Sequence, residues 1–357
     1  MGFQLSPGVQ TREVDLSTSI PAVATSLGAT VGRFTWGPAF EPYLCTSEAD
    51  LVEVFGQPTN DTYPAFLSSV AFLKYSNSLQ VVRVVDSGAM NAAPSGNVTQ
   101  ITGEEDFETQ LDAGTLTEGF YARYPGTYGN GISVETHDGT AGFDAWQYAG
   151  AFDVAPDTGN NELAIAVVVD SEVVESYLVG LAQGDKNSDG GNIWAMDIIN
   201  PKSKLIWINT ANVTNSGANT VTFSGGIAVS AQVDAHCDDG SNDDQATCEG
   251  NANTWVPQVD AGTVGANEYM AGWDKLANAD EVNISIAMAG GLSNESSAQV
   301  AVVSKYIVET VAEGRKDCIA IVSPPKEEVV GVGGATNAVN NVIAWRTDVA
   351  FNSASSY

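Results

Sequence analysis

Residues 282–325 carry the clearest folding pattern of the chain, and they read VNISIAMAGGLSNESSAQVAVVSKYIVETVAEGRKDCIAIVSPP. The stretch Val282–Ala287 has the apolar composition of a buried strand. Ser296–Glu313 has a favourable N-cap as its first residue and is predicted to be a helix, with Gly314 as its stop. Asp317–Val322 again has the composition of a strand.

The predicted helix in this stretch is amphipathic. Apolar residues recur at helical spacing and would form one buried face: Val300, Val303, Ile307 and Val311. Ser323-Pro324-Pro325 ends the second strand, because proline has no backbone N–H to pair. A strand, a helix and a strand within about 40 residues form a βαβ unit with parallel strands and a right-handed crossover. The fold class predicted from this unit is α/β (mixed α+β).

The rest of the chain also mixes helical and strand patterns. A strand-forming segment at 22–33 precedes a turn at Trp36-Gly37-Pro38. Thr46 or Ser47 can cap a helix that runs to residue 55 and that Gly56 ends. Further segments are a helix at 65–75 and strands at 79–85, 120–124, 132–136, 163–170, 172–179, 205–209 and 220–223.

The charge balance excludes some functions. There are 44 acidic residues against 14 basic ones, which gives a formal net charge of −30. Binding to the phosphates of nucleic acids, or to an anionic membrane surface, requires an excess of Lys and Arg, so both are excluded. One interpretation of the acidic surface is that it keeps the protein well solvated. The other is adaptation to salty surroundings, where ions screen the repulsion between the acidic groups. We also expect no secretory signal and no membrane-spanning segment.

The N-terminal residues 1–20 are predicted to be an extended arm. Ser6-Pro7-Gly8 favours turn or extended backbone, and the residues after it alternate in β-compatible types. Composition leaves two interpretations open, a strand added to another sheet or an unattached terminus. The candidate strand comprises Ser6, Pro7, Gly8, Val9, Gln10, Thr11, Arg12, Glu13 and Val14.

Residues 234–256 are predicted to be an acidic surface loop. Cys237 and Cys248 lie in it and could form a disulfide, whereas Cys45 and Cys318 lie in apolar segments and should pack as small hydrophobic residues. Zinc on His236 and the two loop cysteines, or calcium on the loop aspartates, are weaker alternatives. The aspartates concerned are Asp238, Asp239, Asp243 and Asp244.

Catalytic motifs are absent from the sequence. There is no G-x-S-x-G and no Walker A loop, and the chain has 2 histidines, His137 and His236. The glycine-rich stretch 331–334 is interpreted as a flexible loop in preference to a phosphate site. Trp194, Trp207 and Trp273 are interpreted as core or interface anchors. We therefore expect no enzymatic activity, no metal and no cofactor.

Several motifs together resemble the tail sheath proteins of T4-like contractile-tailed phages. They follow the same order as in that family from about residue 6 to the end of the chain, although none of them is decisive alone. They are Ser6-Pro7-Gly8-Val9, the segment 32–40 (GRFTWGPAF), Asp50-Leu51-Val52, Phe55-Gly56-Gln57-Pro58, Phe72-Leu73-Lys74-Tyr75, the segment 81–86 (VVRVVD), Tyr124-Pro125-Gly126 with Gly129, Ser224-Gly225-Gly226, the segments 316–318 and 322–325, Val329-Val330-Gly331 and Ala344-Trp345-Arg346-Thr347.

The resemblance implies a structural protein of the virion that is assembled in the host cytoplasm. Copies would stack as rings around a tail tube protein, between baseplate and tail terminator proteins, and would bind no nucleic acid and insert into no membrane. The arm would add a strand to a neighbouring subunit, and contraction would drive the tube through the host envelope. The alternatives are the sheath of a bacterial contractile injection system and, less favoured, an unrecognised α/β enzyme.

The resemblance and the composition together predict the domain organisation. The chain ends at Tyr357, within the family's pattern. In the family a further C-terminal part completes the inner domain and accepts a neighbour's arm, so we expect either that this chain is a fragment or that the remainder lies elsewhere. Residues 87–118 have few apolar residues and should contribute little core. The predicted units are an arm at 1–20, an inner α/β domain at 21–86 with 262–357, a reduced connector or protrusion at 87–118, a strand-rich middle region at 119–233 and an acidic insertion at 234–261.

Overall fold

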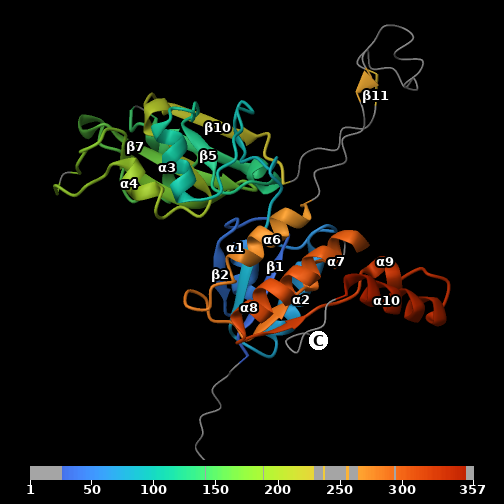
Figure 1. Ribbon diagram of the computed structural model, residues 1–357. Coiled ribbons are helices and arrows are strands. Elements are labelled where there is room, and N and C mark those ends of the chain that lie inside the picture. The colour runs from blue at the N-terminus through green and yellow to red at the C-terminus, as the bar shows by residue number, and fades with distance from the viewer. Residues whose placement is uncertain are drawn as a thin grey trace, which may run out of the picture.

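The computed structural model describes residues 26–140, 142–187, 189–228, 236–237, 255–256, 264–292 and 295–350. Most of these residues belong to two bodies that contact each other (Figure 1). The first body is built from residues 26–86 and 264–350, and the second from residues 87–228. The second body is therefore inserted into the chain of the first. The domain boundaries predicted from the sequence stay a prediction.

A five-stranded sheet forms the centre of the first body. Its strands in spatial order are β14 (Ile319–Ile321), β13 (Ile286–Met288), β1 (Gly28–Gly32), β3 (Leu79–Arg83) and β2 (Pro42–Cys45). β1 lies parallel to β13 and β3, β14 lies parallel to β13, and β2 is antiparallel to β3. The helical segment that starts with α7 (Ser297–Tyr306) connects β13 to β14. The predicted βαβ unit and the α/β class are confirmed.

Helices cover both faces of this sheet. One face packs on α1 (Glu48–Phe55) and α2 (Tyr63–Leu73). The other face packs on α6 (Ala266–Asp274) and α7, which continues as the π-helical segment η7 (Ile307–Ala312) and the short α8 (Glu313–Arg315).

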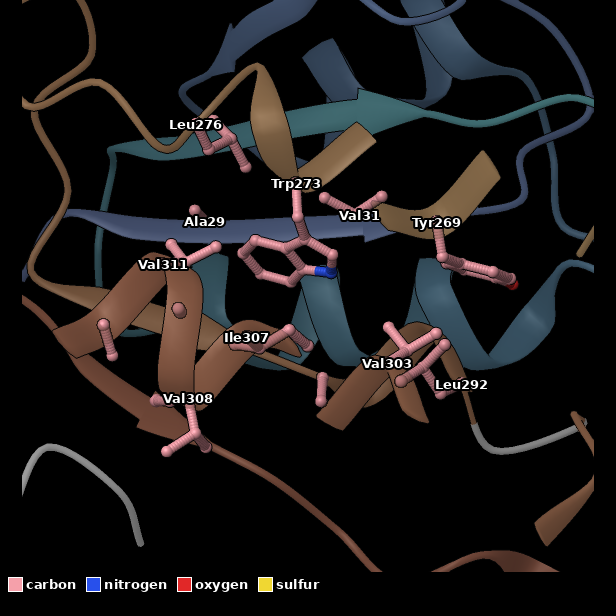
Figure 2. Packing of buried hydrophobic residues seen from close by; sticks show 14 of the residues in the cluster. Ala29, Val31, Tyr269, Trp273, Leu276, Leu292, Val303, Ile307, Val308 and Val311 are labelled. Carbon is pink, nitrogen blue, oxygen red and sulfur yellow. The ribbon is translucent and has the colours of Figure 1, made fainter. Parts of the chain in front are cut away.

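Strand β1 meets these two layers with alternate residues. Ala29 and Val31 face Trp273 of α6, as Figure 2 shows, and all three are buried. Gly32 belongs to the opposite face, where a Cβ atom would lie 2.4 Å from Cβ of Ala65 in α2. The missing side chain thus allows the helix to approach the sheet closely.

Local signals set the helix ends of the first body. The Ser47 hydroxyl accepts a hydrogen bond from the Asp50 N–H at 3.2 Å, and α1 ends at Gly56, so both predicted caps are confirmed. The predicted stop at Gly314 is wrong. The helix continues through Arg315, and Lys316 takes the left-handed conformation instead, with φ of 64°.

The second body is built around an antiparallel sheet. Its strands in spatial order are β4 (Ala93–Pro94), β10 (Ala218–Ser224), β6 (Ile132–His137), β7 (Glu162–Val169) and β8 (Glu172–Gly180). β7 and β8, at two of the predicted strands, form a hairpin with Asp170 and Ser171 at positive φ in its two-residue turn. A separate ladder joins β5 (Phe120–Ala122) to β9 (Ile206–Ile208).

Residues 87–118 contribute more core than the sequence predicts. The helix α3 (Glu104–Asp112) places Phe107 against Trp207, with ring centroids 4.6 Å apart. Ile101 and Leu116 are buried in the same cluster. The expectation of little core is therefore wrong, because a few apolar residues here meet large aromatic partners from the middle of the chain.

Other elements complete the described structure. Helices that the sequence did not predict are α3, α4 (Ala195–Ile199), α6, α9 (Lys326–Val329) and α10 (Ala335–Val349). Short 3-10 turns are η1 (Thr127–Gly131), η2 (Phe143–Ala145), η3 (Ala149–Ala151), η4 (Thr158–Asn160), η5 (Thr210–Asn212) and η6 (Gly290–Leu292). In the acidic insertion, β11 (His236–Cys237) pairs with β12 (Trp255–Val256).

The close approach of α2 to β1 is testable by substitution. Gly32→Ala should destabilise the first body by about 1–3 kcal/mol, because the new methyl group collides with Ala65. Gly314→Ala is the control, since its Cβ would meet nothing within 4 Å, and it should stabilise the chain by about 0.4–1 kcal/mol. Thermal unfolding followed by circular dichroism measures both. Equal melting temperatures for the two variants would contradict the packing.

Candidate assembly sites

The sites predicted from the sequence lie largely outside the described residues. This holds for the strand-forming arm Ser6–Val14 and for Cys248. Cys237 is described only as part of the backbone of β11. The intersubunit strand and the disulfide therefore stay predictions.

The other candidates of the sequence have local roles where they are described. His137 is buried, and its Nδ1 accepts a hydrogen bond from the Gly139 N–H at 3.1 Å while its ring packs on Phe143 and Trp146. Trp207 and Trp273 are core residues. Across the described ranges, no three His, Cys, Asp or Glu side chains gather as metal ligands would, and no helix has the length and hydrophobicity to cross a membrane.

The first candidate site is the free edge of β14. The Ile319 N–H donates to the Ser285 carbonyl at 3.0 Å, and the Ile321 carbonyl accepts from the Ala289 N–H at 2.9 Å, so both isoleucines bond inward to β13. Successive residues of a strand direct their backbone groups to opposite neighbours. The N–H and carbonyl of Ala320 therefore point away from β13, where no described strand pairs with them. This edge has the backbone groups needed to accept another strand.

Exposed apolar side chains accompany this edge. Ile319 and Ile321 are each 44% exposed, although Ala320 between them is fully buried. Further exposed apolar residues lie on α9 and α10 and immediately after α9, and they are Val329, Val330, Val339 and Ile343. In Figure 1 these two helices project from the flank of the first body.

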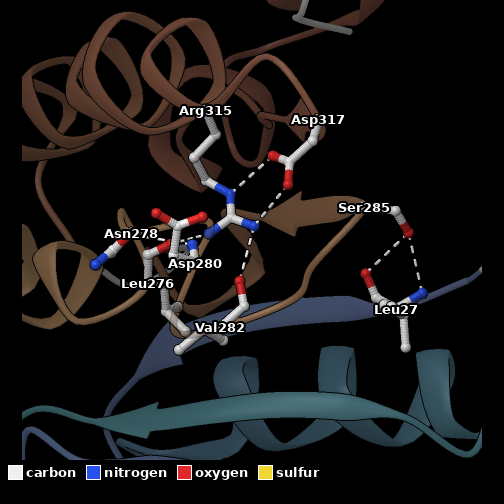
Figure 3. Close-up of polar contacts among 8 residues, drawn as sticks. All are labelled: Leu27, Leu276, Asn278, Asp280, Val282, Ser285, Arg315 and Asp317. Carbon is white, nitrogen blue, oxygen red and sulfur yellow. Dashed lines mark hydrogen bonds and ion pairs between the residues drawn. The ribbon is translucent and has the colours of Figure 1, made fainter.

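A buried guanidinium fixes the chain that leads into β14. Arg315 donates to the carbonyls of Leu276 and Val282, each at 2.8 Å, and pairs with Asp317 at 2.9 Å. Figure 3 shows how these groups lie. The Arg315 side chain thus connects Asp317, which precedes β14, to two carbonyls in the segment that precedes β13. The start of β14 is held in register with its neighbour by these contacts.

The second candidate site is the junction between the two bodies, where Arg83 at the end of β3 is fully buried. Its Nε donates to the Phe34 carbonyl at 3.0 Å and its Nη1 to the Gly37 carbonyl at 2.8 Å, both in the first body. Its Nη2 donates to the Pro125 carbonyl of the second body at 2.7 Å. Burial lowers the pKa of Arg83 to about 9, so the side chain remains charged at neutral pH.

Aromatic rings surround this junction. Trp36 of the first body packs against Tyr124 and Tyr128 of the second, with ring centroids 5.3 and 4.9 Å apart. Burial raises the pKa of Tyr124, so its hydroxyl stays protonated and uncharged at neutral pH.

A cleft of about 680 Å³ opens beside these rings. Residues of both bodies line it, among them Tyr43 and Val54 of the first and Val174 and Tyr177 of the second. An ion pair between Lys204 Nζ and Glu53 Oε1, 2.6 Å long, connects the bodies at this cleft. Both side chains of the pair are more than 60% exposed, at 71% and 63%, so the pair contributes little to stability.

The junction was not predicted from the sequence. The available signal was an arginine in the middle of the apolar segment Val81-Val82-Arg83-Val84-Val85. A charged residue in a buried strand requires nearby acceptors, but the sequence does not show that these acceptors are backbone carbonyls of distant turns.

A buried carboxylate lies near the start of α7. Glu295 accepts a hydrogen bond from the Tyr269 hydroxyl at 3.0 Å, and Arg33 Nη1 lies 3.6 Å from its carboxylate. Burial raises the pKa of Glu295, because the charged form loses solvation, and the two partners offset only part of this effect.

Glu295→Gln tests this effect. The raised pKa means that Glu295 contributes stability below its unfolded pKa, and that this contribution is lost as the pH rises through the folded pKa. Glutamine does not titrate, so the melting temperature of the variant relative to the wild type should rise from pH 4 to pH 8. Glu281→Gln, at an exposed position that precedes β13, is the control. A difference for Glu295→Gln that is constant with pH would contradict the assignment.

Comparisons with known proteins identify the family to which the chain is similar. Residues 27–84 match the family described as Tail sheath protein Gp18 domain III N-terminal region. The chain is 25% identical to the tail sheath protein of Enterobacteria phage T4, over 99% of this chain and 67% of the relative. The tail sheath protein of Vibrio phage KVP40 is 23% identical, over 97% and 66%. That of Salmonella phage ViI is 27% identical, over 96% and 63%.

Two solved structures described as sheath tail proteins also align with the chain. The sheath tail protein of Listeria innocua aligns with a TM-score of 0.47 and 13% identity, over 91% of this chain and 57% of that one. The sheath tail protein of Desulfitobacterium hafniense aligns with a TM-score of 0.42 and 11% identity, over 97% and 61%. The chain spans about two thirds of the length of its curated relatives. The resemblance inferred from the sequence is confirmed, and the chain is similar over nearly its whole length to the tail sheath proteins of T4-like phages.

Proposed function

We propose that this chain is a structural subunit of a contractile phage tail sheath, which polymerises around the tail tube and contracts to drive the tube through the host envelope. The observation that carries the proposal is the similarity to phage tail sheath proteins along 96% to 99% of the chain. The role requires no catalytic residue. Its partners are further copies of the chain, the tail tube protein, and the baseplate and tail terminator proteins.

In this proposal the β14 edge is where a further strand joins the sheet of the first body. The outward backbone groups of Ala320 provide hydrogen bonds, and Ile319 and Ile321 provide apolar contacts. The resemblance placed the acceptor of a neighbour's arm in the C-terminal part of the family, but the open edge described in this chain is β14. We propose that the segment Ser6–Val14 of a neighbouring copy pairs there. Backbone pairing of this kind keeps neighbours attached while the subunits slide past each other during contraction.

Electron microscopy of the source virus tests the role of the chain. Gold-labelled antibody raised against this chain should bind in rows along the tail, on extended and on contracted particles. Labels confined to the capsid, the baseplate or the fibres, or absent from the particles, would exclude the sheath role. Antibody against the major capsid protein is the positional control.

A synthetic peptide of residues 6–14 tests the β14 edge. A fluorescent peptide should bind the chain, and Ile321→Lys should weaken binding because it places a charge on the edge. Val154 lies in the second body and is 63% exposed, so Val154→Lys is the control and should bind the peptide like the wild type. Fluorescence anisotropy measures the binding.

Two N-methylated peptides separate backbone pairing from side-chain contact. One carries the methyl groups at Val9, Thr11 and Glu13, and the other carries them at Gln10 and Arg12. In a peptide paired with β14, alternate residues direct their backbone N–H groups toward the β14 edge. One of the two methylated peptides should therefore lose binding, and the other should keep it. Equal binding by both, or no binding of the unmodified peptide at millimolar concentration, would rule out strand addition at β14.

A further inference from the structure

We infer that Arg83 is the centre of a rigid joint, which sets the orientation of the second body on the first so that the two bodies move as one piece. The joint comprises Arg83, its three carbonyl acceptors at Phe34, Gly37 and Pro125, and the rings packed around them. The inference concerns the chain itself and does not depend on the proposed sheath function.

The geometry of the guanidinium explains the rigidity. Its N–H donors lie in one plane and point in fixed directions. Here two of the donating nitrogens bond to carbonyls of the first body and one bonds to a carbonyl of the second. Among the described residues no carboxylate pairs with Arg83, so backbone carbonyls solvate the buried charge. A rotation of the second body would remove the Pro125 carbonyl and leave a buried donor without a partner, which is costly.

Glycine at position 126 allows this contact. Gly126 has a φ of 140°, a conformation that other residues rarely adopt. A Cβ atom there would lie 3.2 Å from Arg83 Nη2 and 3.3 Å from the Thr35 carbonyl. Three motifs from separate parts of the sequence therefore meet at the joint, and they are Trp36-Gly37-Pro38, the apolar segment around Arg83, and Tyr124-Pro125-Gly126.

The ion pair between Lys204 and Glu53 cannot set this orientation. The Lys204–Glu53 pair is solvent-exposed, and long exposed side chains follow a moving partner at little cost. The cleft of about 680 Å³ beside the joint leaves room for the bodies to rotate toward each other. The buried contacts of Arg83 are what oppose such a rotation.

Pulsed electron–electron double resonance measures the joint directly. Spin labels are placed by Tyr75→Cys in the first body, 92% exposed, and Val154→Cys in the second, 63% exposed. Cys237 and Cys248 are replaced by serine, whereas Cys45 and Cys318 are buried and can remain. The otherwise unmodified chain should give one narrow distance distribution. Arg83→Met retains an unbranched side chain but replaces the guanidinium and its donors with apolar atoms. It should broaden the distance distribution and shift its mean.

Matched variants separate the joint from general stability. Arg315→Met removes a buried arginine bonded to carbonyls within the first body alone, and should lower the melting temperature without changing the distribution. Gly126→Ala should broaden it, whereas Gly142→Ala, also at positive φ but with nothing within 4 Å of its Cβ, should not. Gly126→Ala decides the outcome if Arg83→Met does not fold. An unchanged distribution in Arg83→Met and Gly126→Ala, or equal broadening in the controls, would overturn the inference.

Discussion

The structure depends on one buried cation that has only neutral acceptors. Arg83 ends strand β3 and contacts carbonyls of two turns that belong to different bodies. A buried charge of this kind is tolerated when its hydrogen bonds are made, and each lost bond leaves a donor or a carbonyl unpaired in a low-dielectric interior. The turns after β1 and after β5 are therefore held in place by the same side chain.

The two candidate sites differ in how completely their polar groups are paired. At the junction, buried donors meet buried acceptors from both bodies, which favours a single arrangement. At β14, the outward backbone groups of Ala320 have no described partner strand, and apolar side chains beside them are exposed. A closed junction and an open edge suit a subunit that is internally stiff and forms its variable contacts with other chains.

The sequence predicted elements whose signals are local. The cap at Ser47, the individual strands and helix of the βαβ unit, and the strands β7 and β8 follow from residue types within a few positions of each other. It did not predict α10, because Gly333-Gly334 and several asparagines suggest a loop, yet Trp345 and Val349 are buried against α7 and its neighbours. The core around Phe107 and the role of Arg83 were not predicted either, because both depend on partners that are distant in the sequence. Phe107 stacks on Trp207, 100 residues away, and Arg83 bonds to Pro125, 42 residues away.

The insertion of the second body into the first has a consequence for synthesis on the ribosome. Leu27, at the start of β1, bonds to Ser285 beside β13, and 258 residues separate them. At typical translation rates the early strands emerge on the order of 10 to 50 seconds before the strands that flank them. The second body can complete its own sheet in that interval, while β1 and β3 expose the faces and the edge that α6, α7 and β13 later cover. The nascent chain thus passes through a stage with an unpaired apolar strand, when protection by a chaperone matters most.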